Sequence, residues 1–200
     1  DYVTAAEKLS KQRAKTAAAL DKAVMKELPP LKLERAVFRT ALERLAEDDW
    51  SGQGLDRIAF EVATNPGSAP GPLGRIASGG ELARFLLAIK VVLASVNPER
   101  SLVFDEVDSG VGGATAHAVG ERLERLARDR QVLVITHSPQ VAARGAHHWQ
   151  VLKRSAGQQV ATQVSQLSAG DRREEIARML SGAEITEEAR AAAERLIGTG

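Results

Sequence analysis

The sequence contains no cysteine among its 200 residues. A disulfide framework and a thiolate metal site are therefore excluded, which fits a cytosolic protein but leaves the compartment open. No apolar run approaches the ~20 residues that span a membrane, and no signal peptide is visible. Because the formal net charge is only +1, the chain as a whole does not attract polyanions, and nucleic-acid binding would need a local basic patch.

The composition is sufficient for a sizeable core, since 44% of the residues are hydrophobic. One domain with an appendage is the expected organisation. The chain begins with Asp1, in a stretch of helical composition, rather than with Met. We therefore expect it to be a piece of a longer protein.

The segment 3–28 lacks Gly and Pro and is rich in Ala, Lys, Glu and Leu, which predicts one uninterrupted helix. Pro29 and Pro30 end it. Positions that alternate steps of three and four form a heptad seam with a polar middle, namely Val3, Ala6, Ser10, Arg13, Ala17, Leu20 and Val24. A coiled-coil helix and a solvated surface helix remain equally good interpretations, and no partner for the helix is evident nearby.

An antiparallel hairpin is predicted next. Apolar and polar residues alternate over 36–43 and again over 58–62, with a turn-like segment between them at 50–54. A helix over 33–46 remains an alternative. The segment 65–78 is dense in Pro and Gly and is expected to be a loop.

A βαβ unit follows a predicted buried helix at 81–96, which Asn97 and Pro98 end. The apolar runs 101–104 and 131–136 are typical of buried parallel strands, and the loop and helix at 110–130 would connect them. We expect an antiparallel strand pair, 148–153 and 160–167, around Gly157, and then two helices, 171–180 and 187–197. The fold class is α/β, with parallel strands flanked by helices plus antiparallel strands.

A possible anion site begins at Ser78, where a glycine-rich loop leads into the helix. The first N–H groups of a helix lack partners within it, and the helix dipole adds partial positive charge. Ser78, Gly79 and Gly80 can therefore present a hydroxyl and backbone N–H groups to a phosphate. In isolation this tripeptide is only a turn, so its meaning depends on the residues downstream.

Acidic residues and a histidine follow the two predicted parallel strands. Asp105 ends the first strand and can hold Mg²⁺, which prefers oxygen ligands. Glu106 can accept a proton from, or orient, a water that attacks a γ-phosphate. His137 closes the second strand and would lie at the same carboxyl edge, where ligands bind in open α/β sheets. A neutral or charged imidazole there can hydrogen-bond a phosphate oxygen and the attacking water together.

Four motifs in this order resemble the signature, Walker B, D-loop and switch-histidine motifs of ABC-type ATPases. They read SGGE, LVFDE, VDSGVGG and ITHSPQVA. Within that superfamily, DEVDSGVGG, THSPQVAA, the upstream TNPG and the tail EEIARML resemble the RecN family of bacterial DNA double-strand-break repair proteins, relatives of the SMC proteins. The resemblance extends from about the predicted hairpin to near the end of the chain.

The resemblance implies roles for these residues. Ser78, Gly79 and Gly80 would contact the γ-phosphate of ATP bound by the opposite protomer, and the helix that begins at Glu81 would add its dipole. Asp108, in the D-loop, would cross the dimer interface towards the other active site. ATP and Mg²⁺ are the implied cofactors.

The same resemblance assigns the hydrolytic residues. Asp105 would serve the magnesium ion, Glu106 would be the catalytic base and His137 the switch residue. Two composite ATP sites in an ATP-dependent head-to-head homodimer would follow.

The sequence departs from the family pattern because it contains no G-x-x-x-x-G-K-[ST] loop to cradle the phosphates. In the family this Walker A loop lies in the amino-terminal lobe, with half of the sheet. We therefore expect residues 31–200 to be the carboxyl-terminal lobe of an ABC-type head, and residues 1–30 to be the returning helix of an antiparallel coiled coil. The chain alone would not hydrolyse ATP. The implied partners are the amino-terminal lobe and DNA, without a membrane, in the bacterial cytoplasm at the nucleoid.

Two other functions compete with hydrolysis in DNA repair. A non-hydrolytic tether would use the lobe only for dimerisation, but it would not need Glu106. A transporter ATPase would share all four motifs. Two features argue against the transporter interpretation. An alanine-rich helix lies upstream of SGGE, and Glu81 stands where transporters usually have Gln.

No DNA-binding residue can be named from the sequence. The basic residues are interleaved with acidic ones along the chain, which favours ordinary solvated faces. These residues are the lysines of the first helix together with Arg122, Arg125, Arg128, Arg130, Arg172 and Arg173.

Overall fold

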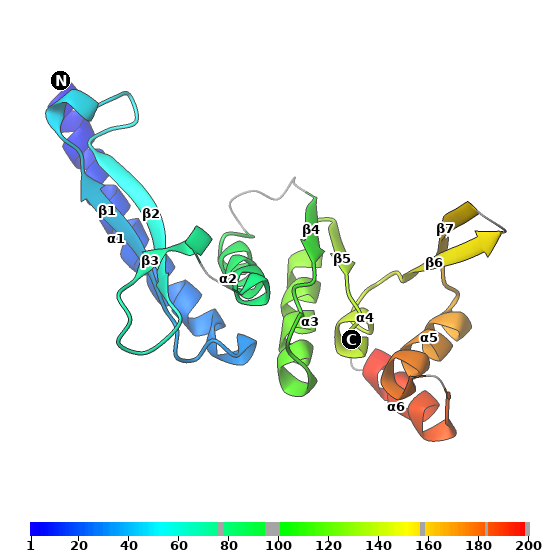
Figure 1. The fold of residues 1–200 in the computed structure, drawn as a ribbon. Coiled ribbons are helices and arrows are strands. Elements are labelled where there is room, and N and C mark those ends of the chain that lie inside the picture. Colours follow the sequence, from blue (N-terminus) through cyan, green and yellow to red (C-terminus); the bar gives the residue numbers. More distant parts are fainter. Residues whose placement is uncertain (76–77, 95–100, 157–158, 183, 199–200) are drawn as a thin grey trace. The chain divides into compact units, whose positions relative to one another are not determined.

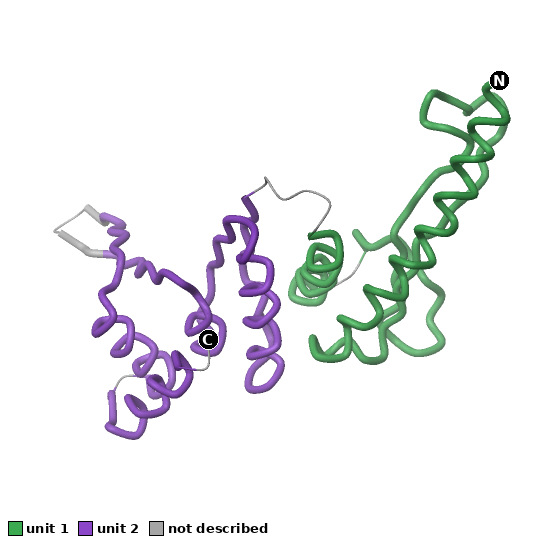
Figure 2. Tube along the Cα trace, turned by 180° about the vertical axis from the view of Figure 1, so that it is seen from behind, with its two compact units in different colours: residues 1–98 green, residues 99–200 purple. Residues whose placement is uncertain are grey.

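The structure is a computed structural model that describes residues 1–75, 78–94, 101–156, 159–182 and 184–198 (Figure 1). The chain divides into two compact units, residues 1–98 and 99–200 (Figure 2). Each unit combines helices with strands, so the predicted α/β class is confirmed. None of the helices in these ranges is long and apolar enough to cross a membrane.

The first unit is built on one long helix and an antiparallel hairpin, as the sequence predicts. Helix α1 spans Tyr2–Glu27 and is followed at once by a 3-10 turn, Pro29–Leu31. Strand β1 (Val37–Arg44) pairs with β2 (Asp56–Ala63) along its whole length. A further 3-10 turn, Glu47–Asp49, lies in the connection between the strands. The helical alternative for 33–46 is therefore wrong.

The hairpin packs along α1. In Figure 1 the two strands run beside the helix, and the seam residues Ala6, Ala17 and Val24 are buried. Polar contacts reinforce this packing towards both ends of α1. Tyr2 donates its hydroxyl to a carbonyl of the strand connection at 2.8 Å. The Asp21 carboxylate accepts hydrogen bonds from the backbone N–H and the hydroxyl of Thr40 at 2.8 and 2.7 Å.

The Pro- and Gly-rich segment leads to the second helix of this unit. It contains a two-residue strand, β3 (Gly71–Pro72), and a 3-10 turn, Leu73–Arg75, where the sequence predicts only loop. Helix α2 spans Gly79–Val92 and is shorter than predicted. Its residues Phe85, Leu87 and Ala88 are fully buried, as expected of a core helix. The predicted stop at Asn97 and Pro98 lies outside the described residues.

The second unit opens with the predicted βαβ arrangement. Strands β4 (Leu102–Asp105) and β5 (Val132–Ile135) are parallel, and helix α3 (Gly113–Ala127) connects them. The register pairs Phe104 with Val134 and Asp105 with Ile135. The ends of both strands therefore meet at one edge of the sheet, as the sequence predicts.

The remainder of the second unit is a hairpin and a helical pair. The short helix α4 (Pro139–Ala142) precedes the antiparallel strands β6 (Trp149–Ala156) and β7 (Gln159–Gln166). The turn predicted at Gly157 lies outside the described residues. Helices α5 (Ala169–Ser181) and α6 (Glu187–Gly198) pack together around Ile176, Ala177 and Ala193.

Candidate functional site

Ser78 caps α2, so the predicted anion site lies at a genuine helix N-terminus. Its backbone is extended, and its hydroxyl oxygen accepts a hydrogen bond from the Glu81 N–H at 3.4 Å. Ser78 and Gly79 are exposed. One turn further, Arg84 is only 6% exposed, and burial lowers its pKa while the Glu81 carboxylate raises it. The start of the first turn of α2 is therefore exposed, whereas its second turn is buried in the core.

Nothing in the described residues explains why position 79 is a glycine. Its φ lies outside the left-handed region, and an added Cβ would meet nothing within 4 Å. Neither backbone strain nor crowding therefore requires glycine at this position. The missing side chain leaves backbone N–H groups accessible from outside the unit, as close approach of a phosphate would need.

Asp105 and Glu106 lie at the carboxyl edge of the β4–β5 sheet, and both are exposed. Glu106 has a backbone φ of 50°, in the left-handed region that residues other than glycine rarely adopt. The turn is held by two backbone hydrogen bonds. The Glu106 N–H donates to the Ile135 carbonyl at 3.3 Å, and the Ser109 N–H donates to the Glu106 carbonyl at 2.9 Å. Such strained positions concentrate at functional sites.

Asp108 joins the loop after β4 to the loop after β5. The Thr136 hydroxyl donates to Asp108 Oδ2, and the Ser138 N–H donates to the Thr136 hydroxyl oxygen at 2.9 Å. Asp108 is only 1% exposed, and its buried Oδ1 has no hydrogen-bond partner among the described residues. In this unit the Asp108 carboxylate lies against Thr136, and its crossing of a dimer interface stays a prediction.

His137 is exposed, and in the sequence it lies between Thr136 and Ser138, which are joined by a hydrogen bond. The structure therefore brings three predicted residues, Asp105, Glu106 and His137, to one sheet edge. Ser78, Gly79, Gly80 and Glu81 belong to the first compact unit.

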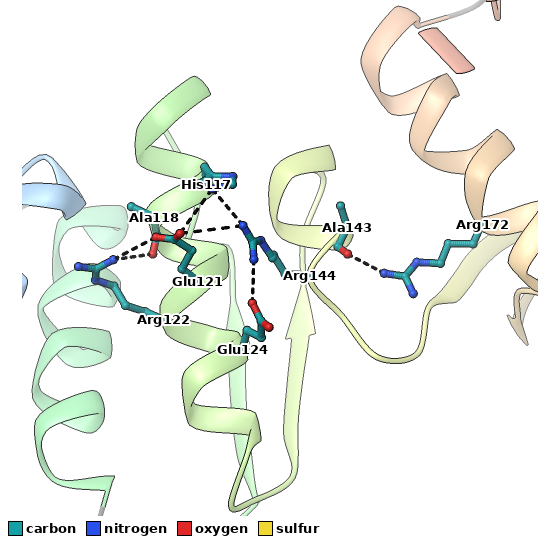
Figure 3. Close-up of polar contacts among 8 residues, drawn as sticks. All are labelled: His117, Ala118, Glu121, Arg122, Glu124, Ala143, Arg144 and Arg172. Atoms are coloured by element: carbon teal, nitrogen blue, oxygen red, sulfur yellow. Dashed lines mark hydrogen bonds and ion pairs between the residues drawn. The ribbon is translucent and has the colours of Figure 1, made fainter. Parts of the chain in front are cut away.

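Helix α4, directly after His137, packs closely against α3. At Gly120 of α3, an added Cβ would lie 3.0 Å from Arg144 Cγ and 3.1 Å from the Gln140 carbonyl oxygen. Arg144 reaches back to α3, donating from Nη1 to Glu124 at 3.0 Å and placing Nη2 3.0 Å from His117 Nε2 (Figure 3). Only glycine allows this approach without displacement of α4.

A second arginine holds α4 from the other side. Arg172 of α5 donates to the carbonyl of Ala143, at the end of α4, at 2.7 Å (Figure 3). Burial lowers the pKa of Arg172, and burial together with Arg172 lowers the pKa of the neighbouring His148. The pKa of Glu175 is lowered chiefly by its hydrogen bond with Arg178.

Sequence patterns alone missed these supporting residues. Arg172 was expected on a solvated face, but it is half-buried and bonded to α4. Gly120, a glycine in the middle of an otherwise amphipathic helix, was a sequence signal only for the close contact between α3 and α4.

The donor set at the sheet edge fits magnesium bound together with a phosphate ligand. The described residues contain no group of three or more His, Asp or Glu side chains that could hold a metal ion. Mg²⁺ is commonly bound through one or two carboxylates plus waters and substrate phosphates. The exposed Asp105 carboxylate could supply one such ligand.

Comparison with known proteins decides the family. No family model matches the chain. The DNA repair protein RecN of Rickettsia bellii is 39% identical over 98% of this chain, which covers 36% of that protein. The RecN protein of Vibrio cholerae is 41% identical over 98% of this chain and is covered to 35%. The chain belongs to the RecN family. It spans about a third of the length of these RecN relatives and corresponds to their carboxyl-terminal part.

Solved structures place the fold among SMC heads. The Smc head domain with a coiled coil and joint from Pyrococcus yayanosii has a TM-score of 0.60 at 21% identity, covering 88% of this chain and 32% of that chain. A structure from work on ATP-driven dimerisation and DNA-stimulated activation of SMC ATPases has a TM-score of 0.50 at 19% identity. It covers 85% of this chain and 96% of that chain. At these identities the likeness establishes the fold of this RecN segment and nothing more.

Proposed function

We propose that this RecN segment is the carboxyl-terminal lobe of an ATP-hydrolysing head that acts in the repair of DNA double-strand breaks. The observation that carries the proposal is the sheet edge where Asp105, Glu106 and His137 meet, with Glu106 held in a left-handed turn. Strain at a glutamate that follows a metal-binding aspartate is expected of a positioned catalytic group.

Each residue at the edge has one task in this proposal. Glu106 accepts the proton of, or orients, the water that attacks the γ-phosphate, a contribution typically worth about 10²–10⁴ in rate. His137 hydrogen-bonds a γ-phosphate oxygen and the same water. Asp105 holds Mg²⁺. The bound ion would neutralise charge on the phosphates.

The cap of α2 serves a different molecule of ATP. Ser78, Gly79 and Gly80 bind the γ-phosphate of ATP held by the opposite protomer, so that dimerisation of the heads depends on ATP. Glu81 lies in the first turn of α2, whose dipole supports this contact. The D-loop, with Asp108 and its exposed glycines, including Gly112, crosses the dimer interface towards the other active site.

The amino-terminal lobe completes the sheet in this proposal. One face of the β4–β5 pair carries Val103, Leu133 and Ile135, which are 63%, 51% and 56% exposed. Parallel sheets are normally covered on both faces. The same lobe would supply the Walker A loop, which this sequence does not contain. The chain alone therefore neither binds ATP tightly nor hydrolyses it.

DNA and a second head are the other partners, and the setting is the bacterial cytoplasm. A tether that only dimerises would gain nothing from a strained Glu106, so we favour hydrolysis. The transporter alternative has no support in the RecN family relationship.

Complementation between lobes tests the proposal. The separately expressed amino-terminal lobe is added to this chain, and ATP hydrolysis is measured with the wild type, Ser78→Arg and Glu106→Gln. Wild type should restore turnover, and both variants should fail. No restoration by wild type would contradict the split-head assignment, and turnover by the chain alone that Glu106→Gln abolishes would contradict its dependence on the other lobe.

A further inference from the structure

The lysines of α1 form a single stripe on the surface of the helix. Steps of three, four, seven and four residues separate Lys8, Lys11, Lys15, Lys22 and Lys26. At 3.6 residues per turn, these positions fall within an arc of about 60°. Along the sequence the lysines are interleaved with acidic residues, but the helix separates the two charges on its surface.

The stripe is opposite the face that α1 buries against the hairpin. Helical geometry places Ala6, Ala17 and Val24 roughly half a turn from the lysines. The acidic side chains lie off the stripe and are engaged elsewhere. Glu7 forms an ion pair with Arg44 of β1 at 3.6 Å, and Asp21 binds Thr40.

The lysines of the stripe have no counter-ions among the residues that the structure describes. All five are exposed, and none forms an ion pair with any residue in the described ranges. Lys11 and Lys15, like Lys22 and Lys26, are four residues apart, a spacing at which like charges destabilise a helix. An ordinary solvated helix face gains stability by pairing Lys with Glu at this spacing. The spacing of these lysines is therefore better explained by binding of a polyanion than by the stability of the helix.

The stripe also has the length and rigidity for an extended polyanion. From Lys8 to Lys26 the rise is about 27 Å, and the hairpin holds α1 along this length. Duplex DNA carries about one negative charge per 1.7 Å of its axis. Flexible lysine side chains contact phosphates as point charges, which suits binding without sequence preference.

We propose that the lysine stripe of α1 binds the phosphate backbone of duplex DNA. The choice of DNA among polyanions rests on the function proposed above. An anionic membrane is a poorer fit, because a helix lying on a bilayer needs an exposed apolar face, and that face of α1 is covered by the hairpin.

The test is the salt dependence of binding between this chain and a short duplex, measured without nucleotide so that failure of ATP hydrolysis cannot affect it. Five phosphate contacts predict a fall in affinity of about 500-fold between 50 and 200 mM salt. Replacing Lys11, Lys15 and Lys22 by Gln should reduce that fall to about tenfold, and Lys→Arg at the same positions should retain it. The Gln variant should unfold at the same urea concentration or a slightly higher one, because like-charge repulsion is relieved.

A matched control removes the same charge from the other unit. Arg128→Gln, Lys153→Gln and Arg195→Gln together change exposed residues outside α1 and should leave the salt dependence as in wild type. Equal effects of the two triple variants would overturn the proposal. So would an absence of duplex binding at low salt, or binding of these lysines to anionic vesicles but not to the duplex.

Discussion

Replacement of Thr136 by Val tests whether the Asp108 bridge holds the loop that carries His137. The variant keeps the shape of the side chain but loses the hydroxyl that donates to Asp108 and accepts from the Ser138 N–H. Since Asp108 is 1% exposed and its Oδ1 already lacks a partner among the described residues, its carboxylate would become a buried charge with no hydrogen bond. A lost hydrogen bond to a charged group costs about 1.5–3 kcal/mol, and the orphaned N–H adds to this. We expect a loss of about 2–4 kcal/mol in the free energy of unfolding.

Urea unfolding followed by far-ultraviolet circular dichroism gives the magnitude, and amide hydrogen exchange in β5 assigns it to the second unit. Asp108→Ala supplies the partner for a double-mutant cycle. In that background Thr136→Val should cost less than about 1 kcal/mol, which corresponds to a coupling near 2 kcal/mol. A loss below about 0.5 kcal/mol in Thr136→Val, or no coupling, would refute the bridge as a stabilising contact.

Two further changes probe the packing of the second unit. Gly120→Ala should lower the free energy of unfolding by about 1–3 kcal/mol, because the new Cβ would lie 3.0 Å from Arg144 Cγ, and an unchanged urea midpoint would show that α4 can shift freely. Burial lowers the pKa of His148, so the unfolded chain binds more protons and stability should fall as the pH drops from 7 to about 5.5. His148→Gln should flatten this dependence, and an equal slope in the variant would assign it to another group.

The order and type of elements followed closely from local sequence signals. Pro29 ends α1, alternation over 36–43 marks β1, and the apolar runs before Asp105 and His137 mark a parallel pair whose ends coincide. These features depend on backbone restriction and on the period of hydrophobic residues, which short stretches of sequence contain.

Long-range contacts could not be predicted in the same way. The packing of α1 on the hairpin joins residues far apart in the sequence, such as Asp21 with Thr40, 19 positions apart, and Tyr2 with Ser51, 49 positions apart. The inward turn of Asp108 depends on Thr136, a partner 28 residues away on another strand. A motif identifies the residue types of a site, but only the fold decides which of them face inwards.

We propose that Glu106 of this RecN segment activates water for ATP hydrolysis in the complete head. Steady-state ATP turnover by the full-length protein that carries this chain, compared between wild type and Glu106→Gln, tests it most directly. The amide keeps the size of the side chain but cannot accept the proton, so turnover should fall by at least about 10²-fold while ATP-dependent dimerisation persists. Turnover at the wild-type rate in Glu106→Gln would contradict the claim.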